Sequence, residues 1–283
     1  MILSIQSHVA YGYVGNKAAC FPLQSLGYDV CPVNTVQFSN HTGYGKWRGE
    51  IFSADHIKQV IQGIKDLEIM DSCKAILSGY LGDSSIGEII LSTVRELRHN
   101  NPNLIYLCDP VIGDFGRGIF VKEGIADFFK NHALSNATII TPNHFEAELL
   151  YGFSINTIED AKTASLYFHK LGIKIFIITS FRSNDLPADK MYVFLSDGTQ
   201  YLLGQTPLVD FSIYPNGTGD LFSELMLGYY LSSFNVESAL KSTLQSIYYV
   251  IQSTNKKNKR ELDVIGHDYK NIDNSNFISV KTV

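Results

Sequence analysis

A glycine-rich turn that ends in an aspartate is the segment of this sequence best suited to chemistry. The run Pro215-Asn216-Gly217-Thr218-Gly219-Asp220 precedes an apolar stretch with helical spacing, which extends from Leu221 to Leu231. Glycines let the backbone turn sharply and expose N–H groups at a helix start, where the helix dipole favours an anion. Asp220 would then lie beside a phosphate or a developing negative charge. Taken alone, the pattern fits equally well an ordinary aspartate near a helix N-terminus after a glycine turn.

The elements that must position this turn follow from the apolar periodicity of the chain. Short apolar runs alternate with segments of helical spacing, which predicts a mostly parallel sheet flanked by helices on both faces, a three-layer α/β fold. We expect strands over residues 1–6, 28–36, 75–78, 104–108, 138–140 and 173–178, a hairpin of 191–195 with 200–203, and an edge strand within 277–283. We expect helices over residues 16–26, 54–67, 84–100, 124–132, 157–171, 219–231 and 236–252, and one that starts within 141–148. The sequence shows no repeat or linker, so residues 1–283 are expected to form a single domain.

Polar side chains directly follow five of the expected strands. They belong to Ser7, Ser78-Gly79-Tyr80, Asp109-Pro110, Thr141-Pro142-Asn143 and Thr179-Ser180. The carboxyl ends of parallel strands line one edge of a sheet, and ligands bind there. Asp109, Asp114 and Glu146 carry the oxygen ligands that Mg²⁺ prefers, directly or through water, although each acid alone is better explained by capping or solvation. Facing a Gly-Thr-Gly-Asp turn, the group predicts phosphoryl transfer from a magnesium nucleotide.

Residues 37–47 are dense in aromatic and hydrogen-bonding side chains and contain turn-prone positions. This composition is poor core material and favours a ligand-facing loop, so residues 37–53 are expected to form a substrate-side flap. A packed aromatic hairpin is the alternative interpretation, and both stay open.

The overall composition excludes several classes of partner. The chain has 283 residues, of which 45% are hydrophobic, and a net charge of −5, so no global basic field indicates nucleic acid. The basic run over residues 256–260 is interpreted as a solvated helix face. Four scattered cysteines without a C-x-x-C pair predict reduced thiols in the cytoplasm. The sequence shows no signal peptide or membrane span, so we expect a soluble protein that binds no membrane.

Four segments carry a resemblance to a known family. They are the run from Asn34 to Tyr44 (NTVQFSNHTGY), Ser78-Gly79-Tyr80, the run from Cys108 to Asp114 (CDPVIGD) and the run from Thr141 to Leu150 (TPNHFEAELL). On these residues the chain resembles the pyridoxal kinases of the ribokinase-like superfamily, and the match runs from Ile5 to the C-terminus. Gly217-Thr218-Gly219-Asp220 is shared more widely and indicates the superfamily only, and Thr179-Ser180 is similar to the animal branch.

The resemblance implies ATP-dependent phosphorylation of the 5′-hydroxymethyl group of pyridoxal, and also of pyridoxine and pyridoxamine. Asp220 would be the general base, and the backbone N–H groups of Gly217, Thr218 and Gly219 would hold the transferring phosphoryl group. The implied vitamin-binding residues, besides Asp220, are Ser7, Phe38, His41, Thr42, Gly43 and Tyr80. The implied ATP-binding residues are Asp109, Thr141, Glu146, Thr179, Thr206, Pro207, Leu208 and Val209. Asp109, Asp114, Thr141 and Glu146 would surround Mg²⁺, with K⁺ or Na⁺ nearby, and the family implies a homodimer.

Three alternative functions stay in view. A hydroxymethylpyrimidine kinase would share the architecture, but the aromatic segment over residues 38–44 favours pyridoxal. A non-catalytic binder of pyridoxal or pyridoxal phosphate would not need Asp220. A sugar kinase fits poorly, because an aromatic loop suits a flat ring better than a polyol.

Glu224 is a departure from the family pattern, because relatives have a small residue at its position one turn after Asp220. If its side chain faced Asp220, the second carboxylate would raise the pKa of the base and shift the acidic limb of the pH–rate profile. We expect it to point to solvent instead.

Overall fold

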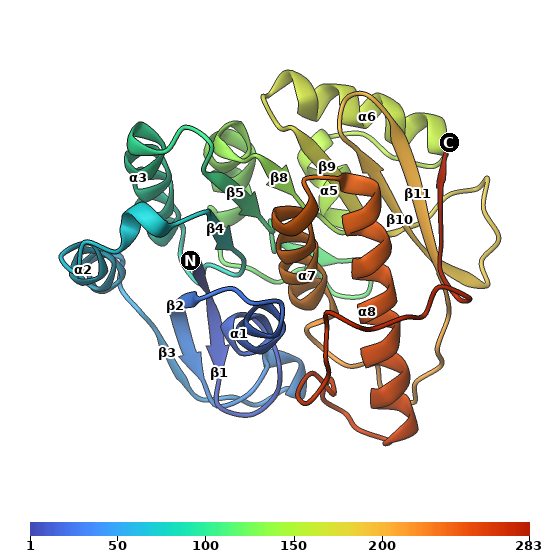
Figure 1. Ribbon diagram of the computed structural model, residues 1–283, viewed down its shortest axis with the longest axis horizontal. Helices are drawn as coiled ribbons and strands as arrows, with labels where there is room; N and C mark the ends of the chain where they lie inside the picture. The colour runs from blue at the N-terminus through green and yellow to red at the C-terminus, as the bar shows by residue number, and fades with distance from the viewer.

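A ten-stranded sheet between two layers of helices forms the centre of the computed structural model, which describes residues 1–283 (Figure 1). The strands are β1 (Ile2–Val9), β2 (Val30–Phe38), β3 (Gly49–Ile51), β4 (Ala75–Ser78), β5 (Ile105–Cys108), β8 (Ile139–Ile140), β9 (Ile175–Phe181), β10 (Lys190–Ser196), β11 (Tyr201–Pro207) and β12 (Ser279–Thr282). Their order across the sheet is β12-β11-β10-β9-β8-β5-β4-β1-β2-β3. The strands from β9 to β2 in this order pair in parallel, whereas β10, β11, β12 and β3 pair antiparallel at the two edges. Because the parallel strands share one direction, their carboxyl ends lie along one edge.

The helices divide between the two faces of the sheet. One face is covered by α1 (Asn16–Ser25), α7 (Thr218–Ser233) and α8 (Val236–Lys256), which lie toward the viewer in Figure 1. The other face is covered by α2 (Ala54–Lys65), α3 (Ser84–Asn100), α4 (Ile125–Phe128), α5 (His144–Tyr151) and α6 (Ile158–Lys170). The expected three-layer architecture is confirmed. No helix is both long enough and apolar enough to cross a membrane.

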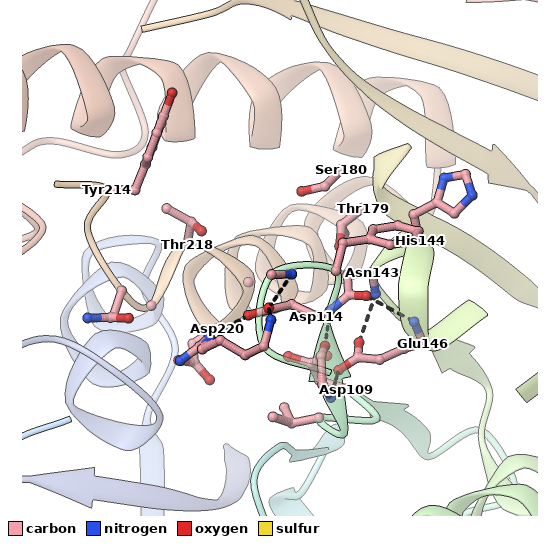
Figure 2. A pocket seen from close by; sticks show the side chains of 18 of the residues that line it. Asp109, Asp114, Asn143, His144, Glu146, Thr179, Ser180, Tyr214, Thr218 and Asp220 are labelled. Carbon is pink, nitrogen blue, oxygen red and sulfur yellow. Dashed lines mark hydrogen bonds and ion pairs between the residues drawn. The ribbon is translucent and has the colours of Figure 1, made fainter. Parts of the chain in front are cut away.

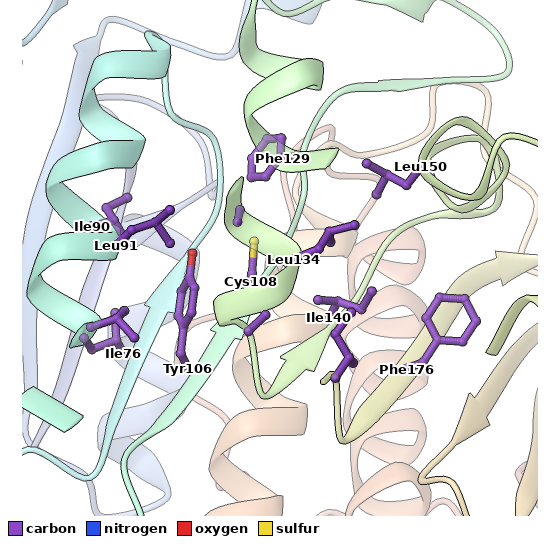
Figure 3. Close-up of a cluster of buried hydrophobic side chains, with 14 of the residues drawn as sticks. Ile76, Ile90, Leu91, Tyr106, Cys108, Phe129, Leu134, Ile140, Leu150 and Phe176 are labelled. Carbon is purple, nitrogen blue, oxygen red and sulfur yellow. The ribbon is translucent and has the colours of Figure 1, made fainter. Parts of the chain in front are cut away.

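The central strands are buried on both faces, which explains their continuous apolar sequences. In β5, Ile105 and Leu107 pack under α7 and α8, while Tyr106 and Cys108 point to the opposite face. Figure 3 shows Tyr106 and Cys108 among the side chains of that second core, which includes Phe176. The Tyr106 hydroxyl is satisfied there by Ser78 Oγ at 2.9 Å. A one-residue slip would exchange the two faces, so side-chain alternation fixes the register of these strands.

Most expected elements are present, with differences at their ends. The expected strand over residues 1–6 continues to Val9, and its register against β2 shifts between Gln6 and His8. The expected edge strand near the C-terminus exists as β12, which pairs with β11. The helix expected over residues 124–132 is α-helical only over α4 and continues as a π-helix from Phe129 to Ala133. A hairpin of β6 (Gly113–Asp114) with β7 (Gly118–Ile119) was not expected.

The segment over residues 37–53 combines the two interpretations that the sequence left open. Its ends form a hairpin, because β3 pairs antiparallel with β2. Its tip is a loop that contains the 3₁₀ turn η1 (Thr42–Tyr44).

Residues 256–260 are exposed to solvent, as expected, but the expectation that they lie on a helix is wrong, because α8 ends at Lys256. Lys257 and Lys259 form ion pairs with Asp263, and the Lys257 Nζ–Asp263 Oδ2 distance is 2.6 Å. Arg260 stacks on the ring of Tyr44. The basic run therefore fixes a tight turn instead of continuing the helix.

The packing of α6 on β9 provides a test of the fold. Phe168 is fully buried, and its ring stacks on Phe176 with centroids 4.4 Å apart. We expect Phe168→Ala to lower the free energy of unfolding by about 3–5 kcal/mol, because it removes a large buried ring and leaves a cavity. Urea unfolding measures this loss. Leu166→Ala on the same helix is the control: Leu166 is 51% exposed, and its change should stay within about 0.5 kcal/mol. Equal effects of the two changes would contradict the packing.

Candidate active site

The glycine turn before α7 is built so that only glycine fits at its centre. Gly217 is the N-cap residue of α7 and has φ 90°, in the left-handed region. A Cβ added at Gly217 would lie 2.0 Å from the carbonyl oxygen of Tyr13, in the loop between β1 and α1. The turn therefore brings the start of α7 against that loop. The first N–H groups of a helix have no partner within the helix, so those of the first turn of α7 are available to an anion.

Three adjacent cavities meet at this turn. The central cavity has a volume of about 440 Å³ and is lined by the turn itself and by the ends of β5, β8 and β9. An apolar cavity of about 290 Å³ joins it on the side of α8, where Thr179, Thr218 and Gly219 line both. A third cavity of about 480 Å³ joins it on the side of β1 and β2, where His41 and Asp220 line both. Asp220 thus lies where the central and third cavities meet.

The third cavity gathers most of the expected vitamin-binding residues. Ser7, Phe38, His41, Thr42 and Tyr80 all line it. The sequence analysis missed its other walls, which are Val9, Val14, Trp47, Ile51, Val111, Phe120 and Lys122. Aromatic and aliphatic side chains line most of the cavity and a few polar groups face into it, so its composition suits a flat ring with polar substituents.

Two further features complete this side of the site. The ring centroids of Trp47 and Phe38 lie 4.1 Å apart, so Trp47 continues the aromatic wall. Gly43 does not line the cavity, but a Cβ there would lie 3.3 Å from Asn216 Oδ1. The loop therefore approaches the glycine turn closely at Gly43.

The apolar cavity contains the four expected nucleotide-side residues Thr206, Pro207, Leu208 and Val209. They come from the end of β11 and the segment after it. The sequence analysis missed the opposite wall, which includes Phe211, Phe222 and Tyr248. This cavity suits an apolar heterocycle.

Carboxylates crowd the central cavity (Figure 2). Burial raises the pKa of Asp109 well above its usual range, and the carboxylates of Glu146 and Asp220 raise it further. Burial also raises the pKa of Asp220, partly offset by a hydrogen bond from the backbone of Gly15. Because the charge of Asp220 contributes to the raised pKa of Asp109, the two carboxyl groups do not ionise independently. A bound cation would relieve this mutual repulsion.

Glu146 and Asp114 already have partners within the protein. Glu146 accepts hydrogen bonds from the backbone N–H groups of Ile112, Gly113 and Asn143, and burial nevertheless raises its pKa to about 7. Burial would raise the pKa of Asp114, but Arg117 lowers it overall through its guanidinium group, 2.6 Å from Oδ2, and its backbone N–H.

The expected metal ligands therefore do not form a protein-only metal site. No three acidic, imidazole or thiolate groups converge closely enough to hold an ion by themselves. Asp109, Thr141 and Glu146 line the same cavity as Asp114, which suits Mg²⁺, an ion that keeps several waters and takes one or two carboxylates together with phosphates.

Ser223, Arg117 and Arg182 at the centre of the site were not expected from the sequence, and neither were the contacts of Asn143, which was expected only as a polar strand-end residue. Ser223 Oγ lies 2.8 Å from Thr141 Oγ1 and donates to the Gly219 carbonyl, so it connects the β8 edge to the glycine turn. Its position one turn beyond Gly219 was the available signal. Asn143 caps α5 and donates to the Gly113 carbonyl at 2.8 Å. Arg117 and Arg182 add positive charge to the central cavity.

Glu224 does not point to solvent, and that expectation is wrong. Its side chain is fully buried, and neither carboxylate oxygen has a hydrogen-bond partner. Burial is the main cause that raises the pKa of Glu224 well above its usual range. Asp220, Cys20 and Asp109 raise it further. The nearby Gln6 side chain has the smallest effect and lowers the pKa, although it makes no hydrogen bond to Glu224. Glu224 is therefore a neutral acid beneath Asp220.

Comparisons with known proteins show the family to which this chain belongs. A model of the phosphomethylpyrimidine kinase family matches residues 35–264. The pyridoxal kinase PdxY of Rubrobacter xylanophilus is 44% identical over 267 residues, which cover 93% of this chain and 91% of that protein. The corresponding protein of Granulibacter bethesdensis is 42% identical and covers 92% of each chain. The chain belongs to the pyridoxal kinase family of the ribokinase-like superfamily.

Solved structures of pyridoxal kinases share the fold along the whole chain. The enzyme from Leishmania donovani, in complex with ADP and pyridoxamine, is 28% identical with a TM-score of 0.89, and the match covers 100% of this chain and 99% of that one. Pyridoxal kinase from Trypanosoma brucei is 31% identical with a TM-score of 0.86, covering 100% and 98%. These family members confirm the ribokinase-like architecture expected from the sequence.

The burial of Glu224 predicts a pH-dependent cost in stability. A carboxyl whose pKa is higher in the folded than in the unfolded state leaves the folded protein with more bound protons, so stability falls as pH rises above about 4.3. We therefore expect Glu224→Gln to gain in thermal stability relative to the original protein between pH 5 and pH 8. Glu88→Gln, at an exposed position of α3, should show no such gain. Identical pH dependence of all three proteins would contradict a neutral, buried Glu224.

Proposed function

We propose that this chain is an ATP-dependent kinase that phosphorylates the 5′-hydroxymethyl group of pyridoxal, and also of pyridoxine and pyridoxamine. The observation that carries the proposal is the position of Asp220. It lies in the first turn of α7 and lines both the central cavity and the third cavity, where the expected vitamin-binding residues gather. A hydroxyl group at that junction would have a base on one side and an anion-binding helix start on the other.

Asp220 suits the role of general base. A base is most effective when its pKa lies near the operating pH, and burial moves the pKa of Asp220 in that direction from its ordinary value. Burial raises the pKa values of Asp109 and Glu224 well above their usual range, whereas that of Asp220 is raised and partly lowered again by the Gly15 backbone. Asp220 would take the hydroxyl proton as the alcohol oxygen forms its bond to phosphorus and the bond to ADP breaks.

The glycine turn would stabilise the phosphoryl group during transfer. Phosphoryl transfer depends mainly on positioning and on stabilisation of the charge on the equatorial oxygens. The backbone N–H groups of Gly217, Thr218 and Gly219, held in place by the close contact of Gly217 with Tyr13, supply preorganised donors for that charge.

His41 supplies a defined hydrogen-bond donor to the vitamin. Burial and, to a smaller extent, the charge of Arg117 lower the pKa of His41 to about 4, so the imidazole is neutral at neutral pH. Its Nδ1 accepts from the backbone N–H of Gly43 at 3.1 Å, so the neutral ring carries its proton on Nε2. That N–H can donate to an oxygen substituent of the ring, while Tyr80 and Phe38 wall the ring itself.

The carboxylate cluster supports a requirement for cations. When bound, Mg²⁺ would neutralise phosphate charge beside Asp109 and Glu146, and a monovalent cation would lie near Thr141 and Thr179. Asp114, which pairs with Arg117, would act near the metal through water. The neighbouring apolar cavity would hold the base and ribose of ATP.

Three further properties belong to the proposal. Residues 1–283 form a single kinase domain, the protein works in the cytoplasm with its four unpaired cysteines, and it forms a homodimer as the family resemblance implies.

A parallel assay tests the proposed substrate. ATP-dependent turnover should be measured with pyridoxal, pyridoxine, pyridoxamine and hydroxymethylpyrimidine under one set of conditions. The third cavity is expected to favour the three pyridine alcohols, because Phe38, Trp47 and Tyr80 provide a wall for a flat ring with several substituents. Faster turnover of hydroxymethylpyrimidine would assign the chain to the activity named by its family model.

Replacement of Asp220 tests the proposed mechanism. We expect Asp220→Asn to lower kcat by about 10²- to 10⁴-fold, because the amide cannot accept the hydroxyl proton. Pyridoxal binding, measured by calorimetry, should be retained. Asp127→Asn at an exposed position of α4 is the matched control and should have normal activity. Near-normal turnover by the Asp220 variant would rule out the base, and a wild-type protein that binds pyridoxal without turnover would indicate a binding protein.

A further inference from the structure

The chain after α8 folds back over the vitamin side of the molecule. The ion pairs of Lys257 and Lys259 with Asp263 fix a turn, and this turn presents Arg260 and Glu261. Glu261 is only 7% exposed. Carboxylates are seldom buried without partners, so the contacts of Glu261 must stabilise its side chain in this position.

Both residues contact Tyr44, which ends the 3₁₀ turn of the vitamin-side loop. The Tyr44 hydroxyl donates a hydrogen bond to Oε1 of Glu261. The Arg260 guanidinium carbon lies 3.5 Å from the centroid of the Tyr44 ring, in cation–π contact. Hydrogen bonds to ionised acceptors are stronger than neutral ones. The C-terminal segment thus holds the tip of this loop through both the ring and the hydroxyl.

The second oxygen of Glu261 contacts another loop of the site. Oε2 accepts a hydrogen bond from the backbone N–H of Tyr13 at 3.2 Å. This approach requires glycine at position 12, which has φ 103° and where a Cβ would lie 2.3 Å from Oε2. The same loop contains Gly15, whose backbone bonds to Asp220. One buried carboxylate therefore joins the vitamin-side loop to the loop that supports the base.

The vitamin-side loop has its own internal bonds, so it can move as a unit. Asn40 Nδ2 donates to the carbonyl oxygens of His41 and Lys46, at 3.1 and 2.9 Å. Ser39 Oγ accepts from the backbone N–H of Arg48 at 3.0 Å. These bonds shape the loop, whereas Tyr44 is the residue that bonds its tip to another part of the chain.

We propose that Glu261 is a positioning residue which, through Tyr44, holds His41 and Thr42 over the bound vitamin. The inference rests on the proposed function, in which these two residues contact the ring. Glu261 itself does not touch the vitamin. Loss of its bond to Tyr44 would let the loop open and would weaken vitamin binding, while the nucleotide cavity beyond α7 would be unchanged.

The test compares Tyr44→Phe with Tyr11→Phe. Both changes remove one hydroxyl, and both residues belong to the same cluster, since their rings lie edge to face with centroids 6.3 Å apart. Tyr11 is 61% exposed and makes no side-chain hydrogen bond, so it is the matched control. We expect Tyr44→Phe to raise KM for pyridoxal on the order of 10-fold, from the loss of one charge-assisted hydrogen bond, with kcat and KM for ATP nearly unchanged. Tyr11→Phe should leave all three constants unchanged.

A readout without turnover separates this inference from the proposed function. Trp47 is the single tryptophan of the chain and lies in the same loop, so quenching of its fluorescence by acrylamide reports loop opening. Quenching should rise in Tyr44→Phe and in Glu261→Ala, and adding Tyr44→Phe to Glu261→Ala should change little, because Glu261→Ala already removes the bond between the two side chains. If Tyr44→Phe and Tyr11→Phe quench alike, the positioning role is overturned. A wild-type protein inactive on every vitamer overturns the proposed function instead, and the quenching comparison still decides the role of Glu261.

Discussion

The crowding of four carboxylates, three of them buried and Asp220 partly exposed, is the constraint on which the rest of the site depends. Asp109, Glu146, Asp220 and Glu224 lie close enough for the charges of several to raise the pKa values of others. Buried like charges are costly, so the site is stable only when most of these groups are protonated, hydrogen-bonded or beside a cation. Glu146 is bonded by three backbone N–H groups, whereas Glu224 has no partner. An anionic polyphosphate would add to the negative charge of this cavity, which is the physical reason for the cation requirement in the proposed function.

Two glycine contacts then set how closely the elements around this cluster approach. A Cβ at Gly15 would lie 2.2 Å from the Ser7 carbonyl oxygen, and one at Gly217 would lie 2.0 Å from that of Tyr13. The loop after β1 is therefore clamped between its own strand and the turn before α7. This close packing places Ser7 and Asp220 along the same cavity, although they are separated by most of the chain. Backbone proximity, more than any side-chain bond, positions the base beside the vitamin cavity.

Features encoded in local sequence could be predicted, and features that depend on distant contacts could not. Apolar periodicity gave the parallel strands and both layers of helices, and strand-end polar residues located the central cavity. The orientation of Glu224 was missed because α7 is apolar on nearly all sides, so helical spacing does not show which face points to solvent. The turn formed by residues 256–260 was not predicted for a related reason. The ion pairs with Asp263 are local in sequence, but only the fold brings Tyr44 to Arg260.

The site separates chemistry from recognition along the chain. The proposed base and the proposed phosphoryl-binding turn are at the start of α7, and the apolar cavity proposed for the nucleotide lies between α7, α8 and the β10–β11 hairpin. The vitamin cavity is built largely from β1, β2 and the loop before β3, at the opposite end of the sheet. Changes in the loop can therefore alter which alcohol binds without disturbing phosphoryl transfer, provided that the loop keeps its position relative to Asp220. The shared superfamily turn and the family-specific loop follow this division. The sheet holds this loop through the edge hairpin of β2 and β3. Contacts at the tip of the loop must therefore fix the position of the tip relative to Asp220.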